Sequence, residues 1–422
     1  MTVTVFSGGA GSGKTYHLMQ RLAEVIAQEP MAEGCKVLAL TFMHGSRRRL
    51  DDRLAGVPGL ARRYDCTTLD SFAARIVRRW QSLATHERYG EPRESDYDET
   101  CRVAGALLAH REVVLWVKAS YPTLIIDEAQ DLSANRLDIV RHLSTELTTL
   151  IAADEFQCLD PALRPNPAWE WLQLQEDHVR LERTMRTNVG SLLDAAAALR
   201  SGMELSIGRG FSFRATANAP LAATFLSNQI GWKVRGKTLA VISPVVKTFA
   251  EGVVEVSATR ATKHGNGPYR IGWEHAEAKV VEALLARIVA PAMTTPADAL
   301  DAVRVLGDPA LYAEVSKWVD RLVRTRREVA ISRQMLSDTI KQIFANRAKF
   351  QRSSDFGYKA MSVHRAKNRE FDHVVVLWPA ATSGDNEQKR RLLYNAVTRA
   401  KEECIVLVQA KNNLDAPPFK QQ

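Results

Sequence analysis

The sequence predicts an α/β protein with two parallel sheets, each core carrying a mostly helical insertion. Short apolar, β-branched runs alternate with helical stretches along most of the 422 residues, which is typical of parallel sheets covered by helices. The runs are numerous enough for two sheets, and a chain of this length has room for about two to four domains. Hydrophobic residues make up 45% and charged residues 25%, so the composition excludes a disordered, collagen-like or disulfide-scaffold protein.

The expected elements follow from these runs in chain order. Residues 2–6 are expected as the first strand, and residues 14–28 as the first helix. The later apolar runs are bounded by polar turns, as strands are. They are Lys36–Phe42, Leu124–Asp127, Thr148–Asp154, His178–Leu181, Thr238–Ser243, Lys359–Val363, His373–Leu377 and Glu403–Val408.

Two stretches break this rhythm and are expected to be helical inserts. Residues 73–118 are Arg-rich with a helical pattern, and residues 251–355 contain long amphipathic segments such as Glu277–Ile288 and Leu311–Val323. We therefore expect a first core over 1–178, with its insert at about 73–118. The second core is expected to combine 179–250 and 356–422 around an insert over 251–355.

Charge and cysteine content bound the partners and the compartment. The net charge of +9 suits a polyanionic partner, although many basic proteins bind no nucleic acid. The five cysteines form no CxxC pair, so we expect free thiols rather than a zinc site or a disulfide framework. No apolar run approaches about 18 residues, and a structured motif starts at once. We expect a soluble, cytoplasmic protein with no membrane partner.

Residues 8–15 fit the phosphate-binding pattern GxxxxGK[ST]. A chance Gly-rich turn is the alternative, but a strand before the motif and a helix after it favour a P-loop. Lys14 is then expected at the β- and γ-phosphates, and the Thr15 hydroxyl at Mg²⁺. The residues expected to cradle the nucleotide are Gly8, Gly9, Ala10, Gly11, Ser12, Gly13, Lys14 and Thr15.

An apolar strand ends in two acids, Asp127 and Glu128. An Asp in this place can hold Mg²⁺ through its water shell, and the adjacent Glu can activate an attacking water. An ordinary solvated strand end is the alternative. The presence of a P-loop favours hydrolysis over mere nucleotide binding.

Residues Asp127–Asp131 resemble the DExQD box of the UvrD/Rep-like superfamily I helicases. Other stretches resemble further motifs of that family, including GDxxQ, LxxNYRS, THxAKGLEF and YVGVTRA, and they occur in the family's order. These stretches are Leu40–Phe42, Thr67–Phe72, Ala153–Gln157, Leu181–Thr187, Ser362–Phe371 and Tyr394–Ala400. The resemblance implies two RecA-like domains with ATP and Mg²⁺ between them and single-stranded DNA across their tops.

The resemblance also implies roles for individual residues. Gln157 is expected to sense the γ-phosphate, and Arg186 and Arg399 to act as arginine fingers from the second core. Glu370 is expected to accept a hydrogen bond from the ribose hydroxyl. An ordinary surface arginine and a solvated loop carboxylate are the alternatives for Arg186 and Glu370.

Six residues are expected along the DNA track. Thr41, Phe42, Thr68 and His364 match family positions that contact single-stranded DNA, and His44 and Ser71 lie beside them. Phe72 fits a core position better, because the apolar residues after it follow helical spacing. Trp169 or Trp171 could stack on a base, or simply pack.

Departures from the family motifs affect the nucleotide base first. Met185 replaces the aromatic that stacks on adenine, and the first strand starts at Thr2, which leaves no room for a Gln-containing segment upstream. Loose nucleotide selectivity is therefore expected. In addition, Asn368 replaces a glycine, and Gln388-Lys389 replaces an acidic pair.

The resemblance implies an ATP-dependent DNA helicase or translocase on single-stranded DNA, moving 3′ to 5′, in DNA repair, recombination or defence. The inserts are short for this family, which favours a second hypothesis. In it the protein is a DNA-dependent ATPase switch or translocase that signals to a partner, such as a nuclease, without unwinding. A P-loop kinase or GTPase is disfavoured by the DExQD box and the downstream arginines.

Overall fold

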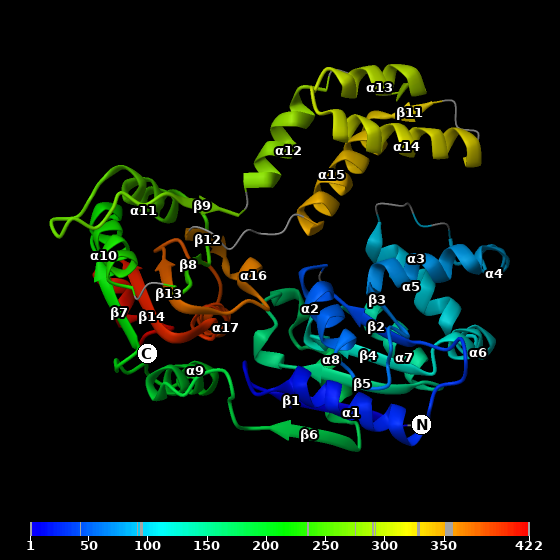
Figure 1. The fold of residues 1–422 in the computed structure, drawn as a ribbon, viewed down its shortest axis with the longest axis horizontal. Helices are drawn as coiled ribbons and strands as arrows, with labels where there is room; N and C mark the ends of the chain where they lie inside the picture. Colours follow the sequence, from blue (N-terminus) through cyan, green and yellow to red (C-terminus); the bar gives the residue numbers. More distant parts are fainter. Residues whose placement is uncertain are drawn as a thin grey trace. The chain divides into compact units, whose positions relative to one another are not determined.

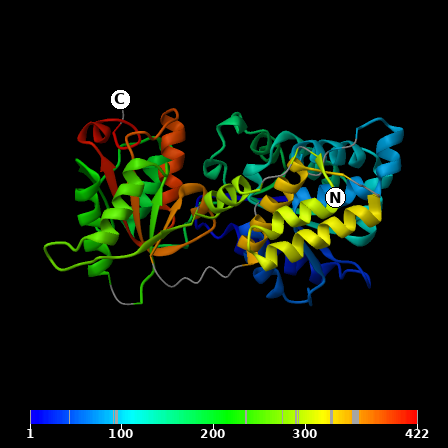
Figure 2. The ribbon, with the colours of Figure 1, turned by 90° about the horizontal axis from the view of Figure 1, so that it is seen from above.

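The computed structural model divides the chain into two compact units. One comprises Met1–Ile271 with Ala360–Gln422, and the other comprises Gly272–Lys359. The structure describes residues 2–42, 44–90, 92, 96–233, 236–274, 276–288, 291, 293–326, 330–350 and 358–420. The first unit contains both large sheets, and the strands nearest the two ends of the chain lie in different sheets (Figures 1 and 2).

The first sheet has six strands in the order β3-β2-β4-β5-β1-β6, and all five pairings between neighbouring strands are parallel. Its central strands are apolar because both faces are covered. Leu38 and Leu40 pack with Phe72 on one face, whereas Val37 and Ala39 pack with α1 on the other. The strands are β1 (Val3–Gly8), β2 (Val37–Thr41), β3 (Tyr64–Thr68), β4 (Thr123–Asp127), β5 (Thr148–Ala153) and β6 (Asp177–Leu181).

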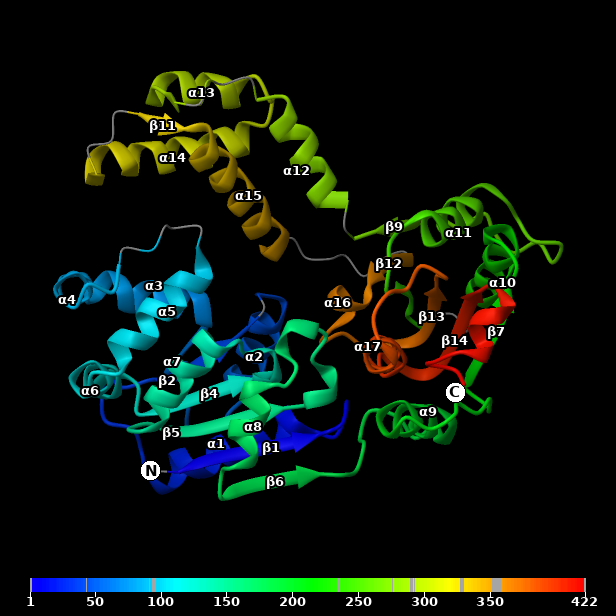
Figure 3. The same cartoon turned by 180° about the vertical axis from the view of Figure 1, so that it is seen from behind.

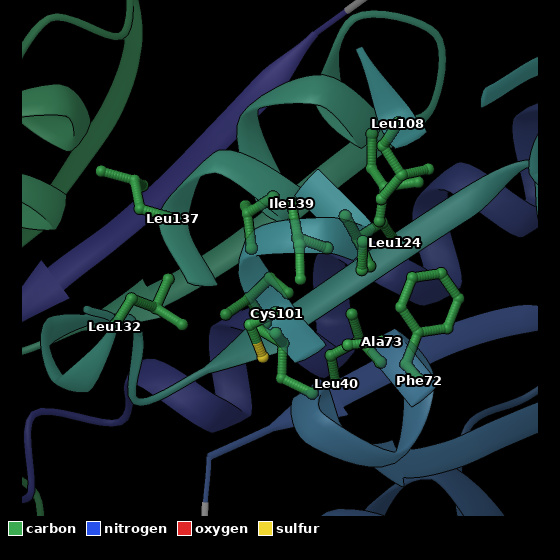
Figure 4. Close-up of a cluster of buried hydrophobic side chains, with 14 of the residues drawn as sticks. Leu40, Phe72, Ala73, Cys101, Leu108, Leu124, Leu132, Leu137 and Ile139 are labelled. Atoms are coloured by element: carbon green, nitrogen blue, oxygen red, sulfur yellow. The ribbon is translucent and has the colours of Figure 1, made fainter. Parts of the chain in front are cut away.

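The helices of the first core include the predicted insert. The expectation of helices over 73–118 is confirmed, since four helices cover this stretch. Phe72 and Cys101 belong to a buried hydrophobic cluster of the first core (Figure 4), so Phe72 is a core residue, as its spacing indicated. The helices are α1 (Lys14–Gln28), α2 (His44–Ala55), α3 (Leu69–Arg79), α4 (Gln81–His86), α5 (Tyr97–Leu108), α6 (Arg111–Ser120), α7 (Ala134–Ser144) and α8 (Pro167–Gln173).

The second sheet has the order β7-β14-β13-β8-β12-β9, and its β7–β14, β14–β13 and β13–β8 pairings are parallel. Helices α10 and α11 lie side by side (Figures 1 and 3). The strands are β7 (Phe211–Thr216), β8 (Leu239–Ser243), β9 (Ile271–Trp273), β12 (Tyr358–Ser362), β13 (Phe371–Trp378) and β14 (Ala400–Gln409). The helices are α9 (Gly190–Ser201), α10 (Ala219–Trp232), α11 (Thr248–Thr259), α16 (Val363–Ala366) and α17 (Asn386–Val397). The predicted pair of RecA-like α/β domains is thereby confirmed.

Of the strands in the two large sheets, three were not predicted: β3, β7 and β9. Each lies at the edge of its sheet, where a strand has one neighbour and less of its surface is covered. Four of the five β3 residues are only partly buried, and β7 is interrupted by exposed Arg214. Neither β3 nor β7 therefore needs the continuous apolar run by which the central strands were recognised.

The second unit has its own hydrophobic core. Buried side chains including Val303, Leu311, Val315 and Leu336 pack together, and the helices expected near 277–288 and 311–323 are present. The expected boundary at 251 lies inside α11, whereas this unit begins at Gly272. Its elements are α12 (Ala276–Ala286), β10 (Met293–Thr294), α13 (Pro296–Arg304), α14 (Pro309–Arg326), β11 (Ile331–Ser332) and α15 (Arg333–Phe350).

All five cysteines are free thiols, as expected. Burial raises the pKa of Cys66 and of Cys101 to about 12, which keeps both protonated at neutral pH. Within the described part of the chain, no helix has the length and apolarity needed to cross a membrane.

Candidate active site

The loop between β1 and α1 has the backbone of a phosphate cradle. Gly11 and Gly13 have φ angles of 76° and 84°, which side chains disfavour. A Cβ on Gly8 would lie 2.4 Å from the Leu181 carbonyl oxygen, and one on Gly11 would lie 2.5 Å from Cβ of Arg186. Glycine is required at these positions because neighbouring segments come this close.

The donors around this loop fit an anion. Helix α1 starts at Lys14 without a side-chain cap, so its first N–H groups are available to a phosphate. The Lys14 ammonium donates to the carbonyl oxygens of Gly8 and Gly9, at 2.9 Å each. The buried Ser12 hydroxyl has no hydrogen-bond partner among the described residues. A triphosphate would satisfy these groups.

The two acids predicted to act with the P-loop lie at the carboxyl end of β4. Asp127 ends the strand, and Glu128 has a left-handed φ of 62°, an unusual conformation that points to a functional constraint. Burial and the Glu128 carboxylate raise the pKa of Asp127, while the Lys14 ammonium opposes that rise. The three charges are therefore close enough to interact.

Thr15 and Asp127 fit a magnesium ion shared with phosphates. Mg²⁺ commonly takes only one or two protein oxygens in such sites, with phosphates and water completing the shell. Thr15 is the second residue of α1. No cluster of three or more His, Cys, Asp or Glu ligands occurs among the described residues, and such a shared site does not require one.

Gln130 was not predicted as a site residue, but its side chain contacts Glu128 and the residue that follows β5. Its side chain is fully buried. Its amide nitrogen donates to the Glu128 carboxylate, and its amide oxygen accepts from the Asp154 N–H at 2.9 Å. Gln130 thus orients Glu128 relative to the end of β5. Its position inside the stretch that resembles the DExQD box was the feature of the sequence that could have indicated this role.

The second core contributes a segment that lies directly on the P-loop. The Met185 N–H donates to the Gly11 carbonyl oxygen at 2.7 Å. The Arg186 guanidinium donates to the Glu370 carboxylate at 3.0 Å and to the Thr398 carbonyl oxygen at 2.7 Å. Although burial alone would raise it, Arg186 and Lys401 hold the pKa of Glu370 below its usual range.

Arg399 is buried and bonds within its own core. Its guanidinium donates to the Asn395 carbonyl oxygen at 2.9 Å and to the Thr398 hydroxyl at 3.2 Å. Burial and the nearby Arg186 charge lower the pKa of Arg399 to about 9, and the Glu128 carboxylate opposes this effect. Arg399 therefore lies within electrostatic reach of Glu128, but its guanidinium donates hydrogen bonds to groups of the second core.

Gln157 lies in a short 3₁₀ turn, Glu155–Gln157, that follows β5. Its side chain is buried, and its N–H donates to the Asp154 carbonyl oxygen at 2.9 Å. The turn meets α17 of the second core: Arg391 of that helix pairs with Glu155. Gln157 is thus placed where the two cores contact each other.

The residues predicted for the DNA track divide into buried and exposed groups. Thr41 and Thr68 are buried, and Thr68 caps α3 by accepting from the Ser71 N–H at 3.2 Å. Phe42 is exposed beneath the Arg136 guanidinium, which lies 5.5 Å from its ring centre. His364 is exposed on α16, but nearby protein atoms still remove part of the hydration of its imidazole, and this desolvation and the Lys367 charge lower its pKa.

Sheet register aligns two of these residues, Thr41 and Thr68, with Asp127. Thr41 pairs with Thr68 on one side and with Asp127 on the other. The His44 side chain lies outside the described residues, although its backbone starts α2. Trp169 and Trp171 pack against the first-core cluster, so both serve packing in this structure.

A buried ion pair between the cores was not predicted. The Lys367 ammonium lies 2.7 Å from a carboxylate oxygen of Asp131, and both side chains are almost fully covered. Asp131 closes the DExQD box, and Lys367 belongs to the stretch resembling THxAKGLEF. The pair connects two motifs that are 236 residues apart.

Two family models match the chain. Residues 2–90 match the UvrD/REP helicase N-terminal domain, and residues 358–407 match the UvrD-like helicase C-terminal domain. Among solved structures, the chain is similar to the nonstructural protein 10 helicase of an arterivirus, with 12% identity and a TM-score of 0.38. That similarity covers 98% of this chain but only 61% of the arterivirus chain. No curated protein matches the sequence.

Proposed function

We propose that the chain, whose residues 2–90 and 358–407 match models of UvrD-like helicase domains, is an ATP-driven motor on single-stranded DNA. We further propose 3′ to 5′ movement, in DNA repair, recombination or defence. The observation that carries the proposal is that the P-loop of the first core is in contact with the second core, through Met185 and Arg186. A nucleotide site shared by two cores can convert phosphate chemistry into relative motion.

In the proposed reaction, Lys14 and the loop N–H groups bind the phosphates of ATP. Thr15 and Asp127 would hold Mg²⁺, which offsets phosphate charge when bound. Glu128 accepts the proton of the attacking water, and Gln130 keeps its carboxylate in place. Gln157 senses the γ-phosphate, and Glu370 binds the ribose.

Arg186 and Arg399 would offset the charge that develops on the transferred phosphoryl group. Both guanidiniums are held by second-core groups in this structure. Their movement toward the phosphates would therefore depend on how the cores close. DNA that contacts both cores favours that closure and so stimulates hydrolysis.

The DNA track is proposed to run over Thr41, Phe42, His44, Thr68, Ser71 and His364. The register of Thr41 with Asp127 supports this, because the two residues end neighbouring strands, so movement at the ATP site would be transmitted directly to the track. Hydroxyl and imidazole groups bind phosphates without reading sequence, and Phe42 offers a stacking face.

The test is ATP hydrolysis by the full chain with and without a single-stranded oligonucleotide. We expect hydrolysis to be stimulated by the oligonucleotide, and DNA affinity to fall as salt increases, since phosphate contacts release counterions. A wild-type rate that ignores DNA would contradict the proposal.

The small insertions favour a second candidate, an ATPase switch that binds DNA and signals to a partner, such as a nuclease, without unwinding. The insertion of the second core is confined to Gly272–Lys359. Strand displacement on a duplex with a single-stranded tail distinguishes the candidates. Displacement supports the helicase, whereas DNA-stimulated hydrolysis without displacement supports the switch.

A further inference from the structure

A polar cluster of three side chains that were not predicted as site residues joins the second core to the phosphate loop. It consists of Asp154 from the first core, Arg200 and Tyr394 from the second, and the Ala10 N–H of the P-loop. Arg200 lies on α9, beyond every stretch that resembles a family motif. Its guanidinium donates to the Asp154 carboxylate at 2.6 Å and to the Tyr394 hydroxyl at 3.1 Å.

The Tyr394 hydroxyl uses its full hydrogen-bonding capacity in this cluster. It accepts from the Ala10 N–H at 2.8 Å and from Arg200, and it donates to the second oxygen of Asp154 at 3.3 Å. Burial and Asp154 raise the pKa of Tyr394 to about 12, so the hydroxyl keeps its proton. The Tyr394 and Phe156 rings meet edge to face at 5.1 Å, and the Arg200 guanidinium lies 5.6 Å from each ring centre.

The cluster lies at the phosphate-binding end of the loop. Lys14, which would hold the β- and γ-phosphates, bonds the carbonyl oxygens of Gly8 and Gly9. A Cβ on Gly9 would lie 3.3 Å from the Tyr394 hydroxyl and 3.8 Å from the Arg200 guanidinium. Arg200 thus reaches the backbone next to the place where the terminal phosphate would bind.

Asp154 places a buried negative charge close to Lys14 and to the expected phosphate site. Its carboxylate is fully buried, and it lies 3.9 Å from the Lys14 ammonium. An uncompensated carboxylate here would attract Lys14 and repel the phosphates of ATP. Arg200 is the closer cation, at 2.6 Å against 3.9 Å, and it neutralises Asp154 from the opposite core.

We propose, resting on the proposed ATPase function, that Arg200 is a positioning residue that neutralises Asp154 and so leaves Lys14 available to the phosphates of ATP. The same contacts hold α9 and α17 against the P-loop. Arg200 therefore links docking of the second core to nucleotide affinity, without touching the reacting atoms.

The test measures KM for ATP and kcat at saturating oligonucleotide, together with the affinity for a fluorescent ATP analogue with Mg²⁺. Arg200→Ala should raise KM about tenfold or more and weaken binding of the analogue, because a buried carboxylate loses its partner. Arg200→Lys should recover part of the loss. Arg209→Ala removes the same charge from an exposed position of the second core and should leave both constants unchanged.

The decisive variant combines Arg200→Ala with Asp154→Asn, because it removes the offending charge together with its partner. KM should return to within about threefold of wild type, since the two effects are coupled. The double variant also covers the case in which Arg200→Ala does not fold. A KM that stays at the Arg200→Ala value in the folded double variant overturns the proposal, as does a wild-type KM in Arg200→Ala. Wild-type protein that hydrolyses no ATP would instead overturn the proposed function.

Discussion

The two halves of the ATPase site differ in how their side chains are held. In the first core, Lys14 and Glu128 are positioned by a helix start and a strand end, and the hydrogen-bond partners of their side chains lie within six residues along the chain. In the second core, Arg186 and Arg399 bond to groups of their own core. The first half is preformed for binding phosphates. The second half contributes only as far as the cores approach each other, and the proposed stimulation by DNA would act on this approach.

The largest effect is expected from the preformed half. Lys14→Ala should lose nearly all hydrolysis, with or without DNA, because the ammonium that binds the β- and γ-phosphates is gone. Steady-state ATPase assays measure this, and circular dichroism verifies the fold. Normal turnover in a folded variant would show that the nucleotide site is wrongly assigned.

Arg399→Ala tests the half of the site that the second core contributes, since it should lower only the rate of ATP hydrolysis that DNA stimulates. A finger of this kind contributes about 10³–10⁵ in rate, so DNA stimulation should disappear. DNA affinity should stay near that of wild type, because Arg399 is buried away from the track. Fluorescence anisotropy with a labelled oligonucleotide provides the affinity. Loss of affinity with a retained stimulated rate would reverse the assignment.

Glu128→Gln should still bind ATP with Mg²⁺, because Lys14 and Asp127 remain, but should hydrolyse it about 10²–10⁴-fold more slowly. Analogue binding and single-turnover hydrolysis separate the two steps. A wild-type rate would mean that another group activates the water.

The smallest effect concerns the nucleotide base. Met185 replaces an aromatic, and its side chain is 67% exposed, so it offers a less specific surface to a purine. GTP or UTP should support hydrolysis within about tenfold of ATP, since one stacking contact contributes about 1–3 kcal/mol. A steady-state comparison of four triphosphates measures this. Strict ATP dependence would point to an adenine contact elsewhere.

One departure from the family pattern has a local explanation. Asn368 stands where the resembling motif has glycine, and its φ is 62°. Asparagine tolerates this left-handed conformation better than most residues. The substitution therefore retains the turn between α16 and β13, which precedes Glu370.

Features that depend on contiguous residues could be predicted from the amino-acid sequence. The P-loop is one of them, because phosphates are bound by the N–H groups of one loop and one helix start. The central strands are another, since burial on two faces requires an uninterrupted apolar run. Contacts between distant residues could not be predicted in this way: Arg200 reaches Asp154, 46 residues away, and Tyr394 bonds Ala10 across 384 residues. Such contacts depend on how the two cores pack. The sequence around Arg200 does not distinguish an arginine exposed to solvent on a helix from one that pairs with a buried carboxylate of the other core.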